Sequence, residues 1–177
     1  MNICIFGAAS NSIDAAYLSA GHALGRELAR RGHTLVFGGG AGGLMGAVAS
    51  GATEAGGKSI GVVPSFLNVD GALYESCTEL IYTETMRDRK QTMEECSDAF
   101  VMTPGGVGTY EEFMEILTLR HLGRHKKPIA VLNTKGYFDD LNAMLRHAAA
   151  EGFLPEADLR LYRCFEDPSA LLDYLER

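Results

Sequence analysis

The chain has 177 residues, of which 46% are apolar and 22% charged, and its formal net charge is −7. This composition is typical of one globular domain with a hydrophobic core, and we expect residues 1–177 to form it. The negative balance and the lack of a basic block argue against nucleic acid as a partner. No apolar stretch is long enough to span a bilayer and no leader precedes the first strand, so we expect a cytoplasmic protein that binds no membrane.

Strand-like and helix-like segments alternate along the chain. Apolar runs predict strands at residues 2–6, 33–37, 59–63, 79–83, 99–103 and 128–133. Helical spacing predicts helices at 14–31, 44–55, 86–96, 109–123, 138–151 and 168–176, with an irregular region at 65–76. This alternation predicts an α/β fold, a Rossmann-like, doubly wound parallel sheet flanked by helices. Such sheets bind ligands at the carboxyl ends of their strands, where this chain has its glycine clusters.

The first glycine cluster, Gly38–Gly43, fits the GxGxxG pattern of dinucleotide-binding proteins. It follows the second strand, however, and the next strand ends at Val63 and Pro64 without the acidic residue that would hold a ribose. NAD binding is therefore a weak alternative. A close approach of helix and strand, next to a nucleotide phosphate or sugar, explains the glycines better.

A basic segment, Met86-Arg87-Asp88-Arg89-Lys90, opens the helix predicted at 86–96. A solvated charged face is the ordinary interpretation, with Lys90 paired to Glu94 one turn later. Cations at a helix N-terminus oppose the helix dipole, which favours a compensating anion or carboxylate nearby. Arginine suits bidentate recognition, so Arg89 is a candidate to bridge a substrate and Glu112.

The second glycine cluster, Thr103-Pro104-Gly105-Gly106-Val107-Gly108-Thr109, lies between a predicted strand and a predicted helix. Free N–H groups at a helix N-terminus attract phosphate, and we expect Thr109 to cap this helix. No GK[ST] ending follows, so a monophosphate fits better than a di- or triphosphate. A purely structural turn is the alternative. A carboxylate so close to phosphate, Glu112, is expected to contact another part of the ligand.

Several other chemistries lack their motifs. The four cysteines form no CxxC pair, the five histidines form no HExxH, and no GxSxG elbow is present. We therefore expect no metal and no serine nucleophile.

The segment PGGVGTYEE, together with Arg89-Lys90 and GGGAGGLMG at 38–46, resembles the Lonely Guy (LOG) family from the first strand to about Leu145. Its members are cytokinin riboside 5′-monophosphate phosphoribohydrolases, long labelled lysine decarboxylases. The resemblance implies cleavage of an N-glycosidic bond without a cofactor, with Arg89 and Glu112 as catalytic residues. It also implies a group of substrate- and phosphate-binding residues, namely Ser10, Gly40, Met86, Lys90, Gly105, Gly106, Val107, Gly108 and Thr109.

The resemblance further implies a homodimer, for which apolar residues at Met114, Leu117 and Leu44 are candidates. The sequence departs from the family pattern at Arg87, where histidine is usual, and at the Ala8-Ala9-Ser10 turn. An N6-prenylated adenine would need an apolar pocket, for which region 65–76 is a candidate. A lysine decarboxylase would need an electron sink such as PLP, for which no lysine has a recognisable setting. The runner-up is a non-catalytic nucleotide carrier.

Overall fold

Seven strands form one fully parallel sheet in the order β4-β3-β2-β1-β5-β6-β7. The fold comes from a computed structural model that describes residues 1–68 and 71–177, so part of the predicted irregular region lies outside the described residues. The strands are β1 (Asn2–Phe6), β2 (Thr34–Phe37), β3 (Lys58–Pro64), β4 (Glu79–Thr83), β5 (Ala99–Met102), β6 (Ile129–Leu132) and β7 (Arg163–Phe165).

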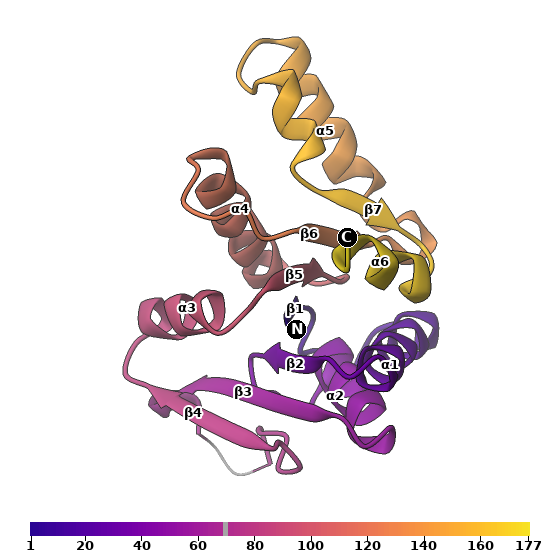
Figure 1. The fold of residues 1–177 in the computed structure, drawn as a ribbon, viewed down its shortest axis with the longest axis vertical. Coiled ribbons are helices and arrows are strands. Elements are labelled where there is room, and N and C mark those ends of the chain that lie inside the picture. The colour runs from indigo at the N-terminus through magenta and orange to yellow at the C-terminus, as the bar shows by residue number, and fades with distance from the viewer. Residues whose placement is uncertain (69–70) are drawn as a thin grey trace.

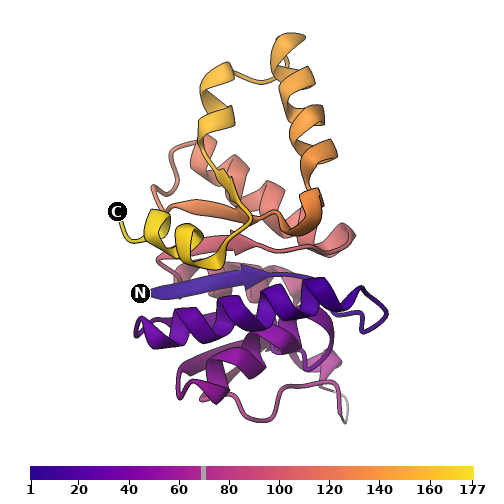
Figure 2. The same cartoon turned by 90° about the vertical axis from the view of Figure 1, so that its right-hand side faces the viewer.

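Six α-helices cover the sheet (Figures 1 and 2). They are α1 (Ala15–Arg30), α2 (Gly43–Glu54), α3 (Met86–Glu95), α4 (Val107–His121), α5 (Asp139–Ala150) and α6 (Pro168–Leu175). Helices α1, α2 and α6 pack on one face, and α3, α4 and α5 on the other. Figure 1 shows that α5 and the segment returning from it extend beyond the β7 end of the molecule. The single-domain α/β fold predicted from the sequence is confirmed.

Strands with two covered faces explain the continuous apolar runs in the sequence. In β1, Ile3 and Ile5 face the core beneath α1 and α2, whereas Cys4 and Phe6 face the core beneath α3 and α4. Leu44 belongs to the first of these cores and is fully buried. The prediction that Leu44 forms part of a subunit interface is therefore wrong, because its side chain packs against α1 within the same chain.

The prediction from the sequence places the N-terminus of α4 wrongly and lacks strand β7. Helix α4 begins at Val107, with Gly106 as its N-cap and no side-chain cap, so the prediction that Thr109 caps it is wrong. Glycine in an extended conformation is sufficient there. Strand β7 was not predicted because two of its three residues, Arg163 and Cys164, are exposed at the sheet edge and the strand forms no apolar run.

Strands β1 and β5 are neighbours, yet the chain leaves them toward opposite edges of the sheet. The boundary between the two halves of the fold therefore runs between β1 and β5. The turns that follow these two strands lie side by side, since the Ala8 N–H donates to the Pro104 carbonyl at 3.1 Å. In open parallel sheets, ligands bind at such a switch point, outside the carboxyl ends of the strands.

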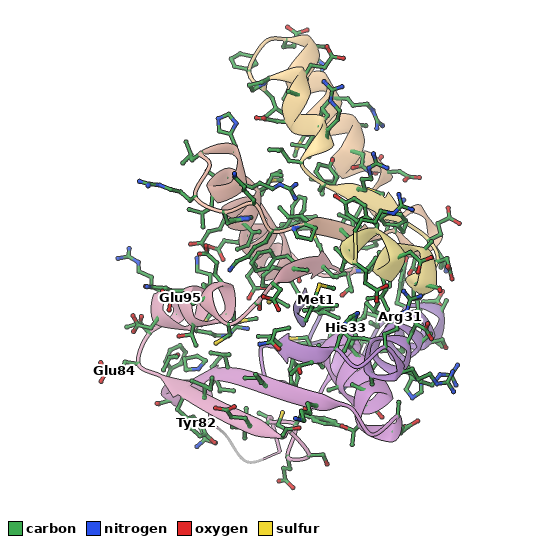
Figure 3. All side chains as sticks on the ribbon, in the orientation of Figure 1. Met1, Arg31, His33, Tyr82, Glu84 and Glu95 are labelled. Atoms are coloured by element: carbon green, nitrogen blue, oxygen red, sulfur yellow. The ribbon has the colours of Figure 1, made fainter. Side chains whose placement is uncertain are left out.

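The opposite end of the sheet carries a network of ion pairs. Met1, Arg31 and His33 lie close together there (Figure 3). Arg31 Nη1 contacts the carboxylate of Asp173 at 2.7 Å, and His33 Nε2 contacts that of Glu176 at 2.7 Å. These contacts fasten α6 to the end of α1, far from the switch point. Within the described ranges, no helix has the length and apolar character needed to cross a membrane.

Candidate functional site

A cleft of about 450 Å³ opens at the switch point. The carboxyl ends of β1, β2 and β3 and the N-termini of α3 and α4 contribute to it. Its lining residues are Gly7, Ala8, Ala9, Gly38, Gly40, Met45, Val63, Leu67, Ala72, Leu73, Met86, Arg89, Gly106, Gly108, Thr109 and Glu112. Among these described residues, the charged ones are Arg89 and Glu112, the two that the resemblance singles out.

Arg89 from α3 and Glu112 from α4 form an ion pair in this cleft. Arg89 Nη1 lies 2.7 Å from Glu112 Oε1, and the two side chains are only 9% and 12% exposed. The Arg89 Nε–H also donates to the Val62 carbonyl of β3 at 3.2 Å. The guanidinium is thus anchored by a strand on one side and holds the carboxylate on the other.

A glycine at the end of β2 makes room for this arginine. A Cβ placed on Gly38 would lie 2.2 Å from Arg89 Nη2, far inside van der Waals contact. In the sequence, Gly38 is one glycine of a cluster and has no feature of its own. Its function of admitting the guanidinium could not be read from the sequence, because Arg89 comes from an element 51 positions later.

Burial and the neighbouring charge of Arg89 shift the pKa of Glu112 in opposite directions. Removal from water raises the pKa of this carboxyl above its usual value, although Arg89 favours its charged form. Glu111 points elsewhere, toward Lys90. Two adjacent glutamates therefore have different environments, and only Glu112 lines the cleft.

The first glycine cluster supports packing within the protein. The amides at the start of α2 already have partners: Leu44 N–H donates to the Ala8 carbonyl at 2.8 Å, and Gly43 N–H donates to Asn11 Oδ1 at 2.7 Å. Gly43 has a φ of 59°, and a Cβ there would lie 2.5 Å from the Ala8 carbonyl oxygen. The cluster thus lets the turn after β1 pack against the N-terminus of α2. Because the Gly43 and Leu44 amides there already donate to this turn, they are not free to bind a pyrophosphate.

The second cluster leaves its helix N-terminus open. Helix α1 is capped by Asp14 and α3 by Thr85, but the N-cap of α4 is Gly106 and has no side-chain hydrogen bond. Gly106, Gly108 and Thr109 line the cleft at this point. The Gly106 N–H has no acceptor among the described residues, and the first amides of a helix have none within the helix. These donors and the positive end of the helix dipole lie at the cleft, an arrangement that binds phosphate in other proteins.

Four of the substrate-binding residues implied by the resemblance lie outside the cleft lining. Lys90 forms ion pairs with Glu111 and Glu115, so the expected pairing with Glu94 is wrong. Ser10 is exposed and its Oγ accepts a hydrogen bond from the Ser12 N–H. The remaining two flank the open helix end: the Val107 side chain is 85% exposed, and Gly105 is buried behind the turn.

An apolar wall completes the cleft and was only partly foreseen. It consists of Met45, Val63, Leu67 and Leu73. The segment carrying Leu73 lies along the first glycine cluster, since Ala41 N–H donates to the Ala72 carbonyl at 3.0 Å. Val63 could have been found as a strand-end residue. Leu67 and Leu73 lie in the region expected to form an apolar pocket, Leu67 at the end of the 3₁₀ helix Ser65–Leu67 and Leu73 in an isolated β-bridge with Gly40.

Comparison with known proteins shows the family to which this chain belongs. The family described as possible lysine decarboxylase matches residues 45–175. The probable cytokinin riboside 5′-monophosphate phosphoribohydrolase LOGL9 of Oryza sativa subsp. japonica is 40% identical over 98% of this chain and 77% of its own length. The chain belongs to the LOG family. A family member from Rhodococcoides fascians, named cytokinin riboside 5′-monophosphate phosphoribohydrolase, is 41% identical over 88% of this chain and 79% of its own.

Solved structures extend the likeness of the fold beyond this family. The molybdenum cofactor binding protein of Rippkaea orientalis has a TM-score of 0.76 at 20% identity, covering 99% of this chain and 94% of that one. The molybdenum cofactor carrier protein of Chlamydomonas reinhardtii has a TM-score of 0.75 at 22% identity, with 99% and 95% covered. At these identities the likeness concerns the fold alone.

Proposed function

We propose that this LOG family protein hydrolyses the N-glycosidic bond of a nucleoside 5′-monophosphate, with a free base and ribose 5-phosphate as products. The observation that carries the proposal is the buried Arg89–Glu112 pair beside the open N-terminus of α4 in one cleft. The names of relatives about 40% identical to this chain support the same reaction. Those names also make a non-catalytic carrier the less favoured alternative, although carriers share the fold.

The phosphate would bind at the N-terminus of α4. The amides of Gly106, Gly108 and Thr109 offer donors and the helix dipole favours an anion. Lys90 is engaged by two carboxylates and does not line the cleft. A monophosphate needs no lysine of the Walker type, so this donor set suits it. Binding the phosphate away from the bond that breaks would use remote binding energy to position the sugar.

Glu112 would act on the ribose. As the bond between C1′ and the base nitrogen breaks, its electron pair leaves with the base, and positive charge develops at C1′. An ionised Glu112 near C1′ interacts most strongly with that transition state, which is how differential binding lowers a barrier. The oxygen of a water molecule then bonds to C1′; one of its protons goes to the base nitrogen that left with the electron pair, and the other stays on the new C1′ hydroxyl. Arg89 would hold the carboxylate in position and keep it ionised.

The apolar wall suggests which bases fit. Met45, Val63, Leu67 and Leu73 present hydrocarbon to the cleft, and its volume is within the ordinary range of about 300–1,000 Å³ for small-molecule sites. We infer that an adenine with an apolar N6 substituent, such as an isopentenyl group, binds better than plain adenine. Parallel assays of AMP and N6-isopentenyl-AMP distinguish the two.

The central test replaces Glu112 with glutamine. We expect Glu112→Gln to keep the fold and to lower base release by ~10²–10⁴, the range for loss of a positioned catalytic group. Glu111→Gln is the matched control, because it makes the same change at the next residue, whose side chain is 54% exposed and pairs with Lys90. Chromatographic quantitation of free base, with circular dichroism as the folding check, measures both. Equal losses in the two variants would refute the assignment.

The phosphate requirement needs its own comparison. Adenosine lacks the group that the α4 N-terminus would hold, so we expect much slower base release from adenosine than from AMP. Equal rates would exclude the proposed phosphate site.

Assembly and location are part of the proposal. Val107 and Leu122 leave large apolar side chains 85% and 62% exposed, but they lie at opposite ends of α4 and form no contiguous patch, so the expectation of an oligomer rests on the family resemblance. We expect a homodimer, to be tested by sedimentation equilibrium, and a cytoplasmic enzyme, to be tested by cell fractionation.

A further inference from the structure

The turn after β6 contacts the glycine turn that precedes α4. This turn contains the 3₁₀ segment Thr134–Gly136, followed by Tyr137. The Tyr137 hydroxyl donates to the Gly105 carbonyl at 2.8 Å. The Tyr137 ring is held edge-on against Phe138 and Tyr17, with centroid distances of 4.9 and 5.8 Å. The hydroxyl therefore reaches the glycine turn from a ring that is itself held by its neighbours.

This hydrogen bond fixes the direction of an amide in the cleft. A peptide unit is planar and trans, so its C=O and N–H point to opposite sides. When the Gly105 carbonyl points toward Tyr137, the N–H of Gly106 must point away from Tyr137. Gly106 lines the cleft, and its N–H has no acceptor among the described residues. Tyr137 thus determines where one of the proposed phosphate donors points.

Packing holds the two residues of this peptide unequally. A Cβ placed on Gly105 would lie 2.1 Å from Thr109 Oγ1, whereas one placed on Gly106 would meet nothing within 4 Å, so the Gly106 side of the peptide is open. Two successive glycines also have access to backbone conformations that other residues avoid. Rotation of the Gly105–Gly106 peptide would turn a carbonyl toward the phosphate in place of an N–H. The Tyr137 hydroxyl supplies a specific contact that opposes this rotation.

The same turn is fastened to the other side of the switch point. Lys135 is the one non-glycine residue of the described chain with a positive φ, 57°, a conformation that side chains disfavour. Its Nζ pairs with the carboxylate of Asp14, which caps α1 by accepting from the Ala16 N–H. Its Nζ also lies 5.6 Å from the centroid of the Tyr17 ring. These contacts position the turn that presents Tyr137.

We propose that Tyr137 is a positioning residue, whose hydroxyl orients the Gly105–Gly106 peptide so that the Gly106 N–H faces the substrate phosphate. The inference rests on the proposed function and adds a residue that does not line the cleft. It predicts an effect specific to the phosphate. A structural role in the fold would affect phosphorylated and unphosphorylated substrates alike.

The kinetic test compares Tyr137→Phe with Tyr17→Phe. Both remove one hydroxyl and keep a ring of the same aromatic cluster, but only the first removes the bond to Gly105. We expect Tyr137→Phe to raise KM for AMP by about 3- to 10-fold, the effect of losing one neutral hydrogen bond. The kcat for AMP and the kcat/KM for adenosine should stay near those of the wild type. Tyr17→Phe should match the wild type in all three. An unchanged KM for AMP in Tyr137→Phe would overturn the proposal, as would an equal loss with adenosine.

An equilibrium measurement separates this inference from the proposed reaction. Calorimetric titration of AMP into Glu112→Gln and into Glu112→Gln/Tyr137→Phe measures binding without turnover. We expect the second protein to bind about 3- to 10-fold more weakly, by the same hydrogen-bond argument. If the wild type releases no base from any nucleoside monophosphate while this difference persists, the reaction is wrong and the role of Tyr137 stands. Equal affinities overturn the role of Tyr137 alone, and no AMP binding by Glu112→Gln overturns both.

Discussion

Gly38 offers a way to move Arg89 without changing any charge. In Gly38→Ala the new Cβ would lie 2.2 Å from Arg89 Nη2, whereas such contacts are essentially never shorter than 3.0 Å. The guanidinium must therefore move by at least 0.8 Å, the difference between these two distances. The backbone can accept alanine, because Gly38 is not among the positive-φ residues.

That shift acts directly on the catalytic pair. The Nη1 atom of Arg89 is 2.7 Å from Glu112 Oε1, and its Nε–H is bonded to the Val62 carbonyl. Displacement by a large fraction of an ångström disturbs both contacts. Misplacement of about 1 Å in an active site can lower the rate ~10²-fold, and we expect a loss of that order in kcat/KM.

A double-mutant cycle tests the route of the effect. Steady-state base release is measured for Gly38→Ala, Arg89→Met and the double variant, with urea denaturation as the check on folding. If Gly38→Ala acts by displacing Arg89, it should have almost no further effect in the Arg89→Met background, since the group that it displaces is gone. Additive losses would refute the reasoning, and so would wild-type activity in Gly38→Ala.

Two further predictions concern pH and stability. Burial raises the pKa of Glu112, and Arg89 opposes that rise. In a plot of kcat/KM against pH, the midpoint of the acidic limb should therefore lie above the ordinary glutamate pKa of 4.5. The limb should move to higher pH in Arg89→Met and vanish in Glu112→Gln; a limb unmoved by Arg89→Met would contradict this coupling. Arg31→Ala removes contacts to Glu27, Asp173 and Glu176, and should lower the free energy of unfolding by about 1 kcal/mol in a salt-sensitive manner without changing kcat/KM. Arg30→Ala is its matched control, because Arg30 is exposed and has no ion pair among the described residues; equal losses of stability in both would contradict a role for the network.

The sequence was most informative where one physical cause dominates. Strands buried on both faces must be apolar along most of their length, so β1, β2, β3, β5 and β6 are visible as short apolar runs. The edge strand β4 is partly exposed, but its Leu80, Ile81 and Tyr82 still mark it as a strand. The edge strand β7 escaped because Arg163 and Cys164 are exposed. The predicted start of α4 is wrong because its N-cap, Gly106, has no side chain that marks a helix N-terminus. Thr109, which lies inside the helix, is a residue type preferred at N-caps, so the sequence favours it in place of Gly106.

For the site, motif and resemblance identified residues but not their contacts. Arg89 and Glu112 were selected together, yet their separation of 2.7 Å depends on how α3 and α4 pack on the sheet. Lys90 lies next to Arg89 in the sequence but faces a different direction, toward Glu111 and Glu115. A helix turns by about 100° per residue, so adjacent motif residues cannot share one direction. Tyr137 carries no motif, and only the fold reveals its contact with Gly105.

The buried pair also bears on the choice between enzyme and carrier, which the fold alone cannot decide. Removing a guanidinium and a carboxylate from water costs more than their attraction commonly returns, so apolar side chains would hold α3 against α4 at least as well. Here both side chains are nearly buried, and a glycine at the end of β2 makes room for one of them. A phosphate carrier would gain nothing from a carboxylate in its cleft, since like charges repel. A catalyst gains from one when positive charge appears on the sugar, and Glu112 has the position and the anchored arginine for that task.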